Sequence, residues 1–129
     1  MDLTRLIGVP YKWAGYSFEG CDCWGLCRIY YEMKGILLPN ILTLYTNEED
    51  HKDMKMVKNA IKPKFKQIPY ESAMEGDICL FNIAGLPIHV SIFLDKKTFI
   101  HSTEGNTSSI ERFSSFKYRN KLDSIWRPI

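Results

Sequence analysis

Apolar residues recur at two different spacings along this chain, and the change of spacing separates a helical region from a strand-rich one. Between residues 23 and 34 the apolar positions lie three and four residues apart, as on one face of a helix. These positions are Leu26, Ile29, Tyr30 and Met33. Asp22 stands where a helix N-cap is expected and Gly35 where a helix ends. The pattern therefore predicts a helix over residues 23–34.

From residue 77 onward, short apolar runs alternate with turn residues, which is typical of strands. The expected strands cover residues 77–81, 88–94, 98–103, 110–112 and 124–127. Before the helix, residues 1–8 predict a short helical or irregular lead-in, and residues 9–22 an aromatic loop with several glycines. One helix followed by an antiparallel sheet predicts an α+β fold.

The region between the helix and the strands predicts a helical insert around residues 40–70. The second helix of the chain is expected here, over residues 47–61, with Met54, Val57 and Ile61 facing inward. Pro63 ends this helix. The chain has 129 residues and no internal repeats, so its length predicts a single domain over residues 1–129.

Composition narrows the classes of partner. Apolar residues make up 45% of the chain, enough for a packed core, and the formal charge of +2 is too small to indicate nucleic-acid binding. No window approaches the roughly 18 apolar residues that a membrane span needs. The first residues carry neither the basic nor the apolar region of a signal peptide, which predicts synthesis in the cytoplasm. Any activity outside the cell would then need another delivery route.

The candidate chemistry lies in one cysteine and two histidines. Cys23 opens the predicted helix, and His89 and His101 lie on predicted strands. A helix N-terminus favours the thiolate, which is the nucleophilic form, and a nearby imidazole completes the deprotonation. This combination predicts a cysteine hydrolase, whereas each residue alone more often has a structural role.

The other cysteines indicate neither a metal site nor a disulfide framework. Cys21, Cys23 and Cys27 have the spacing C-x-C-x₃-C, and Cys79 is isolated, whereas zinc sites use paired C-x₂-C spacings. Without a secretion signal a disulfide framework is the weaker interpretation. We expect no metal and no organic cofactor.

The turn between two strands decides whether the histidines share a face. A two-residue turn over residues 96–97 would pair Ile92 with His101 and place the histidines on opposite faces. A three-residue turn over residues 95–97 would pair Ser91 with His101 and place both histidines on one face. We predict the three-residue turn, because it leaves no lone histidine in the aliphatic layer of Val90 and Ile92.

Four segments in order resemble the NlpC/P60 family of papain-like cell-wall hydrolases, and particularly its phage-tail branch. Residues 10–15 (Pro-Tyr-Lys-Trp-Ala-Gly) resemble the family's P-Y-x-W-G-G, and residues 20–26 (Gly-Cys-Asp-Cys-Trp-Gly-Leu) its D-C-S-G-L. Residues 75–81 resemble P-G-D-L-V-F-F, and residues 89–102 resemble H-V-G-I-Y-L followed by F-I-H-A. Two departures are Ala14 in place of a glycine and Trp24 in place of the commoner serine.

The resemblance implies a papain-like fold and a role for each matched residue. Cys23 would be the nucleophile, His89 the general base and His101 the residue that orients His89. Tyr11 would stabilise the oxyanion together with the backbone N–H of Cys23. The residues Asp22, Ser91 and Trp24 would shape the substrate site.

The resemblance also implies a substrate and a setting. The expected reaction is hydrolysis of peptide bonds in bacterial peptidoglycan stem peptides through a thioester acyl-enzyme, next to D-glutamate and a diamino acid. Two alternatives remain open: an amidase or acyltransferase on another substrate, and a non-catalytic module of a phage tail. The expected partners are peptidoglycan and phage-tail or secretion-apparatus proteins, with delivery to the cell wall or association with a virion.

Overall fold

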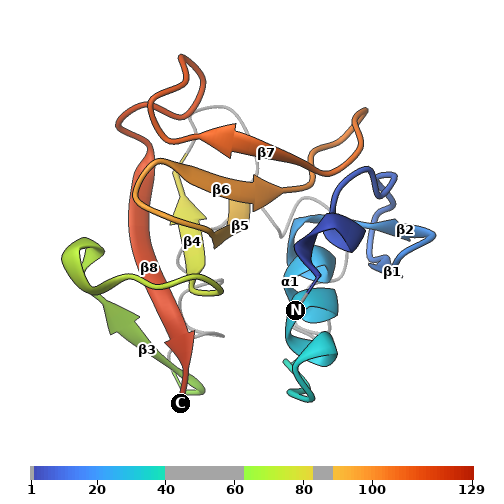
Figure 1. Cartoon of the computed structure of the whole chain (residues 1–129), viewed down its shortest axis with the longest axis horizontal. Helices are drawn as coiled ribbons and strands as arrows, with labels where there is room; N and C mark the ends of the chain where they lie inside the picture. The colour runs from blue at the N-terminus through green and yellow to red at the C-terminus, as the bar shows by residue number, and fades with distance from the viewer. Residues whose placement is uncertain (1, 40–62, 83–88) are drawn as a thin grey trace.

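The structure is a computed structural model that describes residues 2–39, 63–82 and 89–129 (Figure 1). Its helix, α1 (Cys23–Met33), begins and ends as predicted. The Asp22 carboxylate accepts the backbone N–H of Gly25 at 2.7 Å, as an N-cap does. Gly35 has φ +80° and the N–H of Ile36 donates to the Tyr31 carbonyl, so a left-handed glycine closes the helix.

Six strands form one antiparallel sheet in the order β3-β8-β4-β5-β6-β7. They are β3 (Phe65–Ile68), β4 (Ile78–Phe81), β5 (His89–Phe93), β6 (Thr98–His101), β7 (Ser109–Arg112) and β8 (Leu122–Pro128). The α+β prediction is confirmed, and strands β4 to β8 lie where the sequence predicts them. Strand β3 was not predicted, because its buried residues are its two ends and the pattern does not alternate.

Among the described residues, four short elements accompany α1 and the large sheet. The lead-in is a 3-10 turn, η1 (Leu3–Leu6), as predicted, and a second turn, η4 (Tyr70–Ser72), follows β3. The predicted loop before α1 contains a small hairpin, β1 (Tyr16–Ser17) and β2 (Gly20–Cys21). The predicted helix over residues 47–61 lies outside the described residues, and the last part of the predicted insert contains β3.

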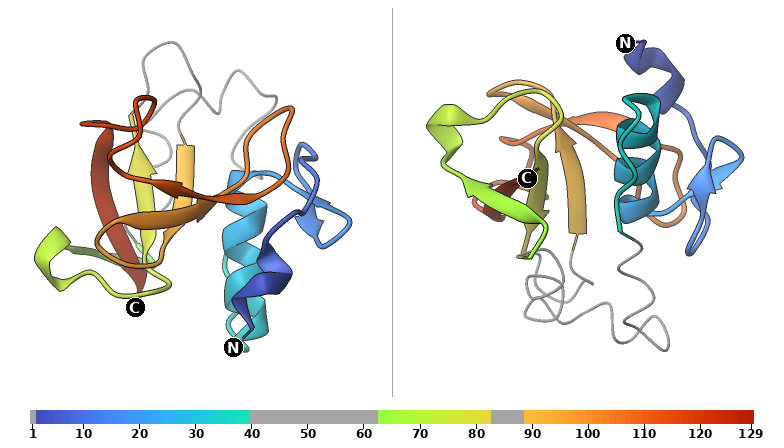
Figure 2. Two further views of the ribbon diagram at one scale, coloured as in Figure 1. Left: turned by 45° about the horizontal axis from the view of Figure 1, so that its top comes forward. Right: turned by 90° about the horizontal axis from the view of Figure 1, so that it is seen from below.

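The sheet curls around one side of α1. Figure 1 shows β6 and β7 crossing over the ends of β4 and β5, with α1 beside them and β3 at the opposite edge. The two views in Figure 2 agree that β4 and β5 lie between α1 and β8. Of the strands in the large sheet, β5 therefore lies next to the helix, and its first residue is His89.

The alternation of strand residues divides the core into two parts. The helix-side core packs α1 against the sheet and contains Leu26, Ile29, Ile78, Leu80, Val90, Ile92 and Ile100. The aromatic core lies on the other face of the same strands and contains Phe81, Phe93, Phe99, Phe113 and Tyr118. Both faces of β5 are buried, and the helix-side core is the aliphatic layer that the sequence predicts.

Among the described residues, none of the helices has the length and apolar character that a membrane crossing requires.

Candidate active site

Cys23 is the first residue of α1, and its side chain is only 8% exposed. Burial raises the pKa of the Cys23 thiol to about 12, and the neighbouring Asp22 carboxylate adds to the rise. Backbone hydrogen bonds from Val90, Trp24 and Cys23 itself act in the opposite direction but are the smaller effect. The backbone at the helix N-terminus lowers this pKa as expected, but burial outweighs it, so the net shift is upward and Cys23 is a neutral thiol in the resting structure.

The position of Cys23 is set by Asp22, whose carboxylate is almost fully buried. One oxygen caps α1 at Gly25, and the other accepts the backbone N–H of Ala14 at 3.0 Å. Ala14 has φ +63°, a left-handed conformation that favours the glycine found in the family at this position. Asp22 therefore joins the loop before β1 to the first turn of the helix, and each of its carboxylate oxygens accepts one of these hydrogen bonds.

Two glycines allow this loop to lie directly on the helix. A Cβ atom added at Gly25 would lie 1.8 Å from the carbonyl oxygen of Gly15, far inside van der Waals contact. A Cβ atom at Gly15 would lie 2.4 Å from the carbonyl oxygen of Gly20. The N–H of Asp22 also donates to the Gly15 carbonyl at 3.2 Å. The positions of Gly15 and Gly25 therefore have no room for a side chain.

The two histidines share a face of the sheet, as the three-residue turn predicts. Ile92 pairs with Ile100, which places Ser91 opposite His101 in the same register. The Asp95 carboxylate accepts the backbone N–H groups of Lys97 and Thr98 and so stabilises the turn. In consequence His89 Nε2 lies 2.9 Å from His101 Nδ1.

This contact fits two arrangements of the protons on the histidine pair, which differ in the ring that donates. Burial lowers the pKa of His101 to about 4, so His101 is neutral near neutral pH. Nδ1 of a neutral His101 that carries its proton on Nε2 accepts the Nε2–H of His89. In this arrangement a neutral His89 carries no proton on Nδ1. This nitrogen is the one that can act as a base.

Tyr118 is a site residue that the sequence analysis missed. Its ring centroid lies 5.9 Å from that of His89 and 5.2 Å from that of His101, so it packs against both. Burial raises the pKa of Tyr118 to about 12, with smaller contributions from Glu111 and Cys23. Tyr118 follows β7 in a segment of mixed polar residues, and no local pattern in the sequence marks it.

Ser102 is a second residue that sequence reasoning passed over. Its hydroxyl donates to the Cys21 carbonyl at 3.1 Å, and both residues are buried. Ser102 directly follows His101, and Cys21 is two residues before Cys23. This bond joins the strand of the histidines to the loop that leads into the nucleophile helix.

Two residues predicted to shape the substrate site lie in the core instead. Trp24 is fully buried, its Nε1–H donates to the Pro39 carbonyl at 2.9 Å, and its ring packs edge-on against Phe65. Ser91 is buried in β5, where it pairs with Cys79 of the neighbouring strand β4. Trp24 is buried because both sides of α1 are covered, by the sheet and by the loops on either side.

Tyr11 lies beside the site. It is half-buried and forms a parallel backbone bridge with Cys21, and the N–H of Lys12 donates to the Cys21 carbonyl at 3.0 Å. Tyr11 therefore runs alongside the segment that ends at the nucleophile. Its predicted part in stabilising an oxyanion stays a proposal.

All four cysteines are free thiols and all are buried. Burial raises the pKa of Cys21 to about 11 and that of Cys79 to about 12, and it raises the pKa of Cys27 as well. Within the described part of the chain, His, Cys, Asp and Glu side chains form no group of three or more that could hold a metal ion.

A curated protein is similar to this chain in sequence. Dipeptidyl-peptidase 6 of Lysinibacillus sphaericus is 27% identical over 99 residues, which cover 77% of this chain and 29% of that protein. The chain thus spans less than a third of the curated relative.

Solved structures share the fold. An NLP/P60-family lipoprotein-like protein of Staphylococcus aureus has a TM-score of 0.65 at 26% identity, over 97% of this chain and 38% of that one. The NlpC/p60 domain of the peptidoglycan hydrolase SagA has a TM-score of 0.63 at 21% identity, over 96% of this chain and 91% of that one.

The sequence profile described as the NlpC/P60 family matches residues 8–127. The match includes α1, the pair His89 and His101, and most of β8. The chain belongs to the NlpC/P60 family.

Proposed function

We propose that this protein is a cysteine peptidase in which Cys23, His89 and His101 form the catalytic set. The observation that carries the proposal is the 2.9 Å contact between His89 Nε2 and His101 Nδ1, with the Val90 backbone next to His89 hydrogen-bonded to the Cys23 thiol. A binding module has no use for a buried thiol at a helix start beside two aligned imidazoles. Family membership and the relatives named above support hydrolysis as the reaction class.

The first step of the proposed reaction forms the acyl-enzyme. His89 Nδ1 takes the proton of the Cys23 thiol as the sulfur attacks the carbonyl carbon, which gives a tetrahedral oxyanion. The backbone N–H of Cys23, which has no acceptor within the helix, and Tyr11 stabilise this oxyanion. His89 then gives its proton to the leaving amine, the C–N bond breaks, and a thioester to Cys23 remains.

The second step releases the acid. His89 Nδ1 removes a proton from water, which attacks the thioester and expels Cys23 as the thiolate, and the proton returns to the sulfur. Throughout both steps, His101 Nδ1 accepts the Nε2–H of His89 and stabilises the transient imidazolium. Because His101 is neutral, its Nδ1 keeps the lone pair that this task needs.

The substrate of this proposal is the stem peptide of bacterial peptidoglycan. Support comes from the family and from SagA, which is named a peptidoglycan hydrolase. The test is digestion of purified peptidoglycan by the protein and by Cys23→Ala, with the muropeptides identified by mass spectrometry. Stem-peptide fragments that appear with the wild type and not with Cys23→Ala support the proposal. Intact muropeptides in both digests would refute the substrate.

We further propose that a phage tail or a secretion apparatus delivers the domain to the wall. The support is the tryptophan at position 24, which resembles the phage-tail branch of the family. Mass spectrometry of purified virions and of culture medium tests this, and recovery of the protein only in the cytoplasmic fraction would contradict it.

A further inference from the structure

Tyr118 brings a hydroxyl group into the aromatic core, whose other four rings belong to phenylalanines. The side chain is buried, with 3% of the residue exposed. Its ring centroid lies 5.4 Å from that of Phe81 and 5.2 Å from that of Phe99. A phenylalanine would fill the same space among these neighbours. Packing therefore explains the ring of Tyr118 but not its hydroxyl.

This hydroxyl forms no hydrogen bond with any part of the chain that the structure describes. Buried polar groups in proteins nearly always have a partner. The backbone of Tyr118 is held in place, because its N–H donates to the Ser115 carbonyl at 3.1 Å and its carbonyl accepts the N–H of Lys121 at 3.0 Å. The hydroxyl is thus fixed in position and lacks a partner of its own, as expected of a group that binds a ligand.

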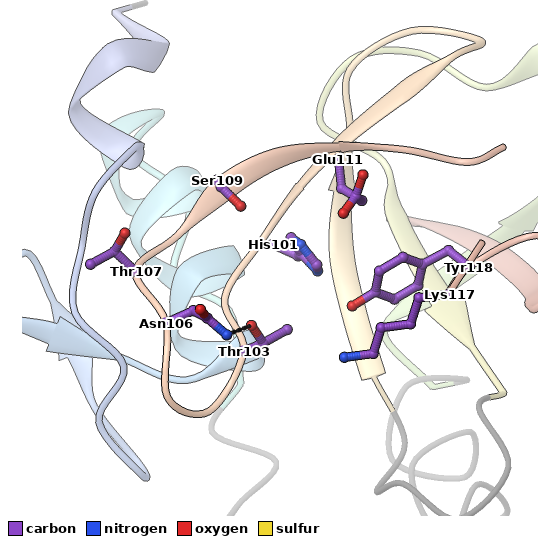
Figure 3. Close-up of a pocket in the computed structure, with 8 residues that line it drawn as sticks. All are labelled: His101, Thr103, Asn106, Thr107, Ser109, Glu111, Lys117 and Tyr118. Carbon is purple, nitrogen blue, oxygen red and sulfur yellow. Dashed lines mark hydrogen bonds between the residues drawn. The ribbon is translucent and has the colours of Figure 1, made fainter. Parts of the chain in front are cut away.

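A polar pocket of about 360 Å³ opens beside Tyr118 (Figure 3). Tyr118 lines it together with His101 and with polar side chains that include Thr103 and Asn106. Figure 3 shows the hydroxyl oxygen of Tyr118 at the end of the ring that points into the pocket. A space of this size with polar walls has room for water molecules. The hydroxyl without a partner therefore faces a place that water can occupy.

This place is next to the groups of the proposed reaction. The centroid of the Tyr118 ring lies 5.9 Å from that of His89 and 5.2 Å from that of His101. Tyr118 is also within electrostatic reach of the Cys23 sulfur, since a charge on Cys23 contributes to its raised pKa. Because that pKa is about 12, the hydroxyl stays neutral. Water at Tyr118 is therefore close to the base and to the carbon that Cys23 carries after acylation.

We propose that the Tyr118 hydroxyl orients the water molecule that hydrolyses the acyl-enzyme. One O–H of this water donates to His89 Nδ1 and the other donates to the Tyr118 oxygen, so that a lone pair of the water oxygen is directed at the thioester carbon. The oxygen attacks, the first proton passes to His89, the C–S bond breaks, and the proton returns to the Cys23 sulfur. Tyr118 exchanges no proton. The inference rests on the proposed peptidase function and deepens it, because it adds a catalytic residue to the second step.

The two steps of the reaction separate this role from a structural one. His89 acts in both steps, whereas water reacts only in the second. Loss of the hydroxyl should therefore slow the hydrolysis of the thioester and leave its formation unchanged. A displaced His89 would slow both steps.

The test uses the umbelliferyl ester of L-alanyl-γ-D-glutamate, with the ester on the γ-carboxyl group. Acylation of Cys23 releases fluorescent umbelliferone, so a fast phase measures acylation and the following steady phase measures hydrolysis of the thioester. For Tyr118→Phe we expect a steady phase about 10-fold slower and an unchanged fast phase, because one hydrogen bond to the attacking water is lost. Cys23→Ala serves as the blank.

The matched control is Tyr70→Phe, which also removes one hydroxyl beside the aromatic core. The Tyr70 ring packs against Phe93 and Phe113, and its hydroxyl donates to the Lys96 carbonyl. Tyr70 does not line the pocket. This variant should keep both phases at the wild-type rates.

Hydroxylamine gives a second measurement on the same acyl-enzyme. It is a stronger nucleophile than water and converts the thioester to a hydroxamic acid in place of the free acid. At one hydroxylamine concentration, the ratio of hydroxamic acid to free acid should be about 10-fold higher for Tyr118→Phe than for the wild type, because only attack by water uses the hydroxyl. Mass spectrometry measures this ratio.

The outcomes separate this inference from the proposed function. If Tyr118→Phe slows both phases by the same factor, or if it keeps both phases and the product ratio of the wild type, the inference is overturned and the peptidase proposal stands. If the wild type shows no fast phase and no thioester on Cys23, the peptidase proposal falls and the inference falls with it.

Discussion

The two faces of strand β5 differ in what they hold. Val90 and Ile92 face α1 and are surrounded by aliphatic side chains of the helix-side core. His89 and Phe93 face the other way, next to the rings of the aromatic core. One face packs against the helix that begins at Cys23, and the other holds the imidazole of His89.

The faces also differ in the surfaces they offer to a polar group. The helix-side core contains many aliphatic side chains, which cannot accept the N–H of an imidazole. In the aromatic core, His89 has the imidazole of His101 as a hydrogen-bond partner and the flat rings of Phe81 and Tyr118 as packing surfaces. The aromatic face can therefore bury a histidine pair whose hydrogen bond is satisfied.

The largest expected effect comes from removing the base. His89→Ala should lower kcat/KM on peptidoglycan peptides by about 10²–10⁴-fold, because proton transfer loses its positioned group. Urea unfolding should change little, since His89 stands at the end of its strand. A variant that retains wild-type kcat/KM would show that another group takes the thiol proton.

Two core substitutions test whether the two faces of β5 have different roles. Ile92→Ala should lower the free energy of unfolding by about 2–5 kcal/mol and Phe99→Ala by about 3–5 kcal/mol. At a temperature where both are folded, Ile92→Ala should keep the pH profile of kcat, whereas Phe99→Ala should shift it, because Phe99 packs 5.1 Å from the His101 ring. Equal pH profiles in the two variants would contradict the division.

The burial of His101 predicts a pH-dependent stability. Its folded pKa of about 4 lies below the ordinary value of 6.5, so the unfolded chain binds the proton more tightly. Stability from this residue is complete above pH 6.5 and falls as the pH drops toward 4, by about 2 kcal/mol at pH 5. Urea unfolding at pH 7 and pH 5 measures this difference.

His101→Asn is the control for that measurement, because asparagine does not titrate. The variant should lose correspondingly less stability between pH 7 and pH 5, and its amide oxygen can still accept the N–H of His89. An unchanged pH dependence in His101→Asn would assign the effect to other groups.

The smallest expected effect is at the helix cap. Asp22→Asn keeps an oxygen for Gly25 but turns an amide toward the N–H of Ala14, which should lower the free energy of unfolding by about 1 kcal/mol. Because the Asp22 charge helps to raise the pKa of Cys23, the variant should also lower that pKa. Ultraviolet titration of the thiolate, with Cys23→Ser as the blank, measures the change, and a higher pKa in the variant would contradict it.

Residues with local signals were predicted well. The helix has both of its caps in the sequence, and the alternation in β5 with the turn at Asp95 decided the register of the histidines. Strand β3 escaped prediction because its pairing with β8 joins residues far apart in the chain.

The missed site residues have the same cause. Tyr118 and Ser102 reach the site through packing and through one long-range hydrogen bond, and neither leaves a periodic pattern. Trp24 was misplaced because its position beside the nucleophile suggested exposure, whereas the tertiary contacts of α1 bury it. The pKa of Cys23 is raised rather than lowered because the thiol is buried, and a sequence motif does not indicate how deeply a residue is buried.

The contact of Gly25 with Gly15 limits how this sequence can vary. Since a side chain at Gly25 would overlap the Gly15 carbonyl, even alanine there must move the segment that holds Asp22 and the nucleophile. The two motifs that contain these glycines are ten residues apart, but they form one steric unit. In a library of random variants, functional clones should keep position 25 as glycine, and any exception should carry a second change in the loop around position 15.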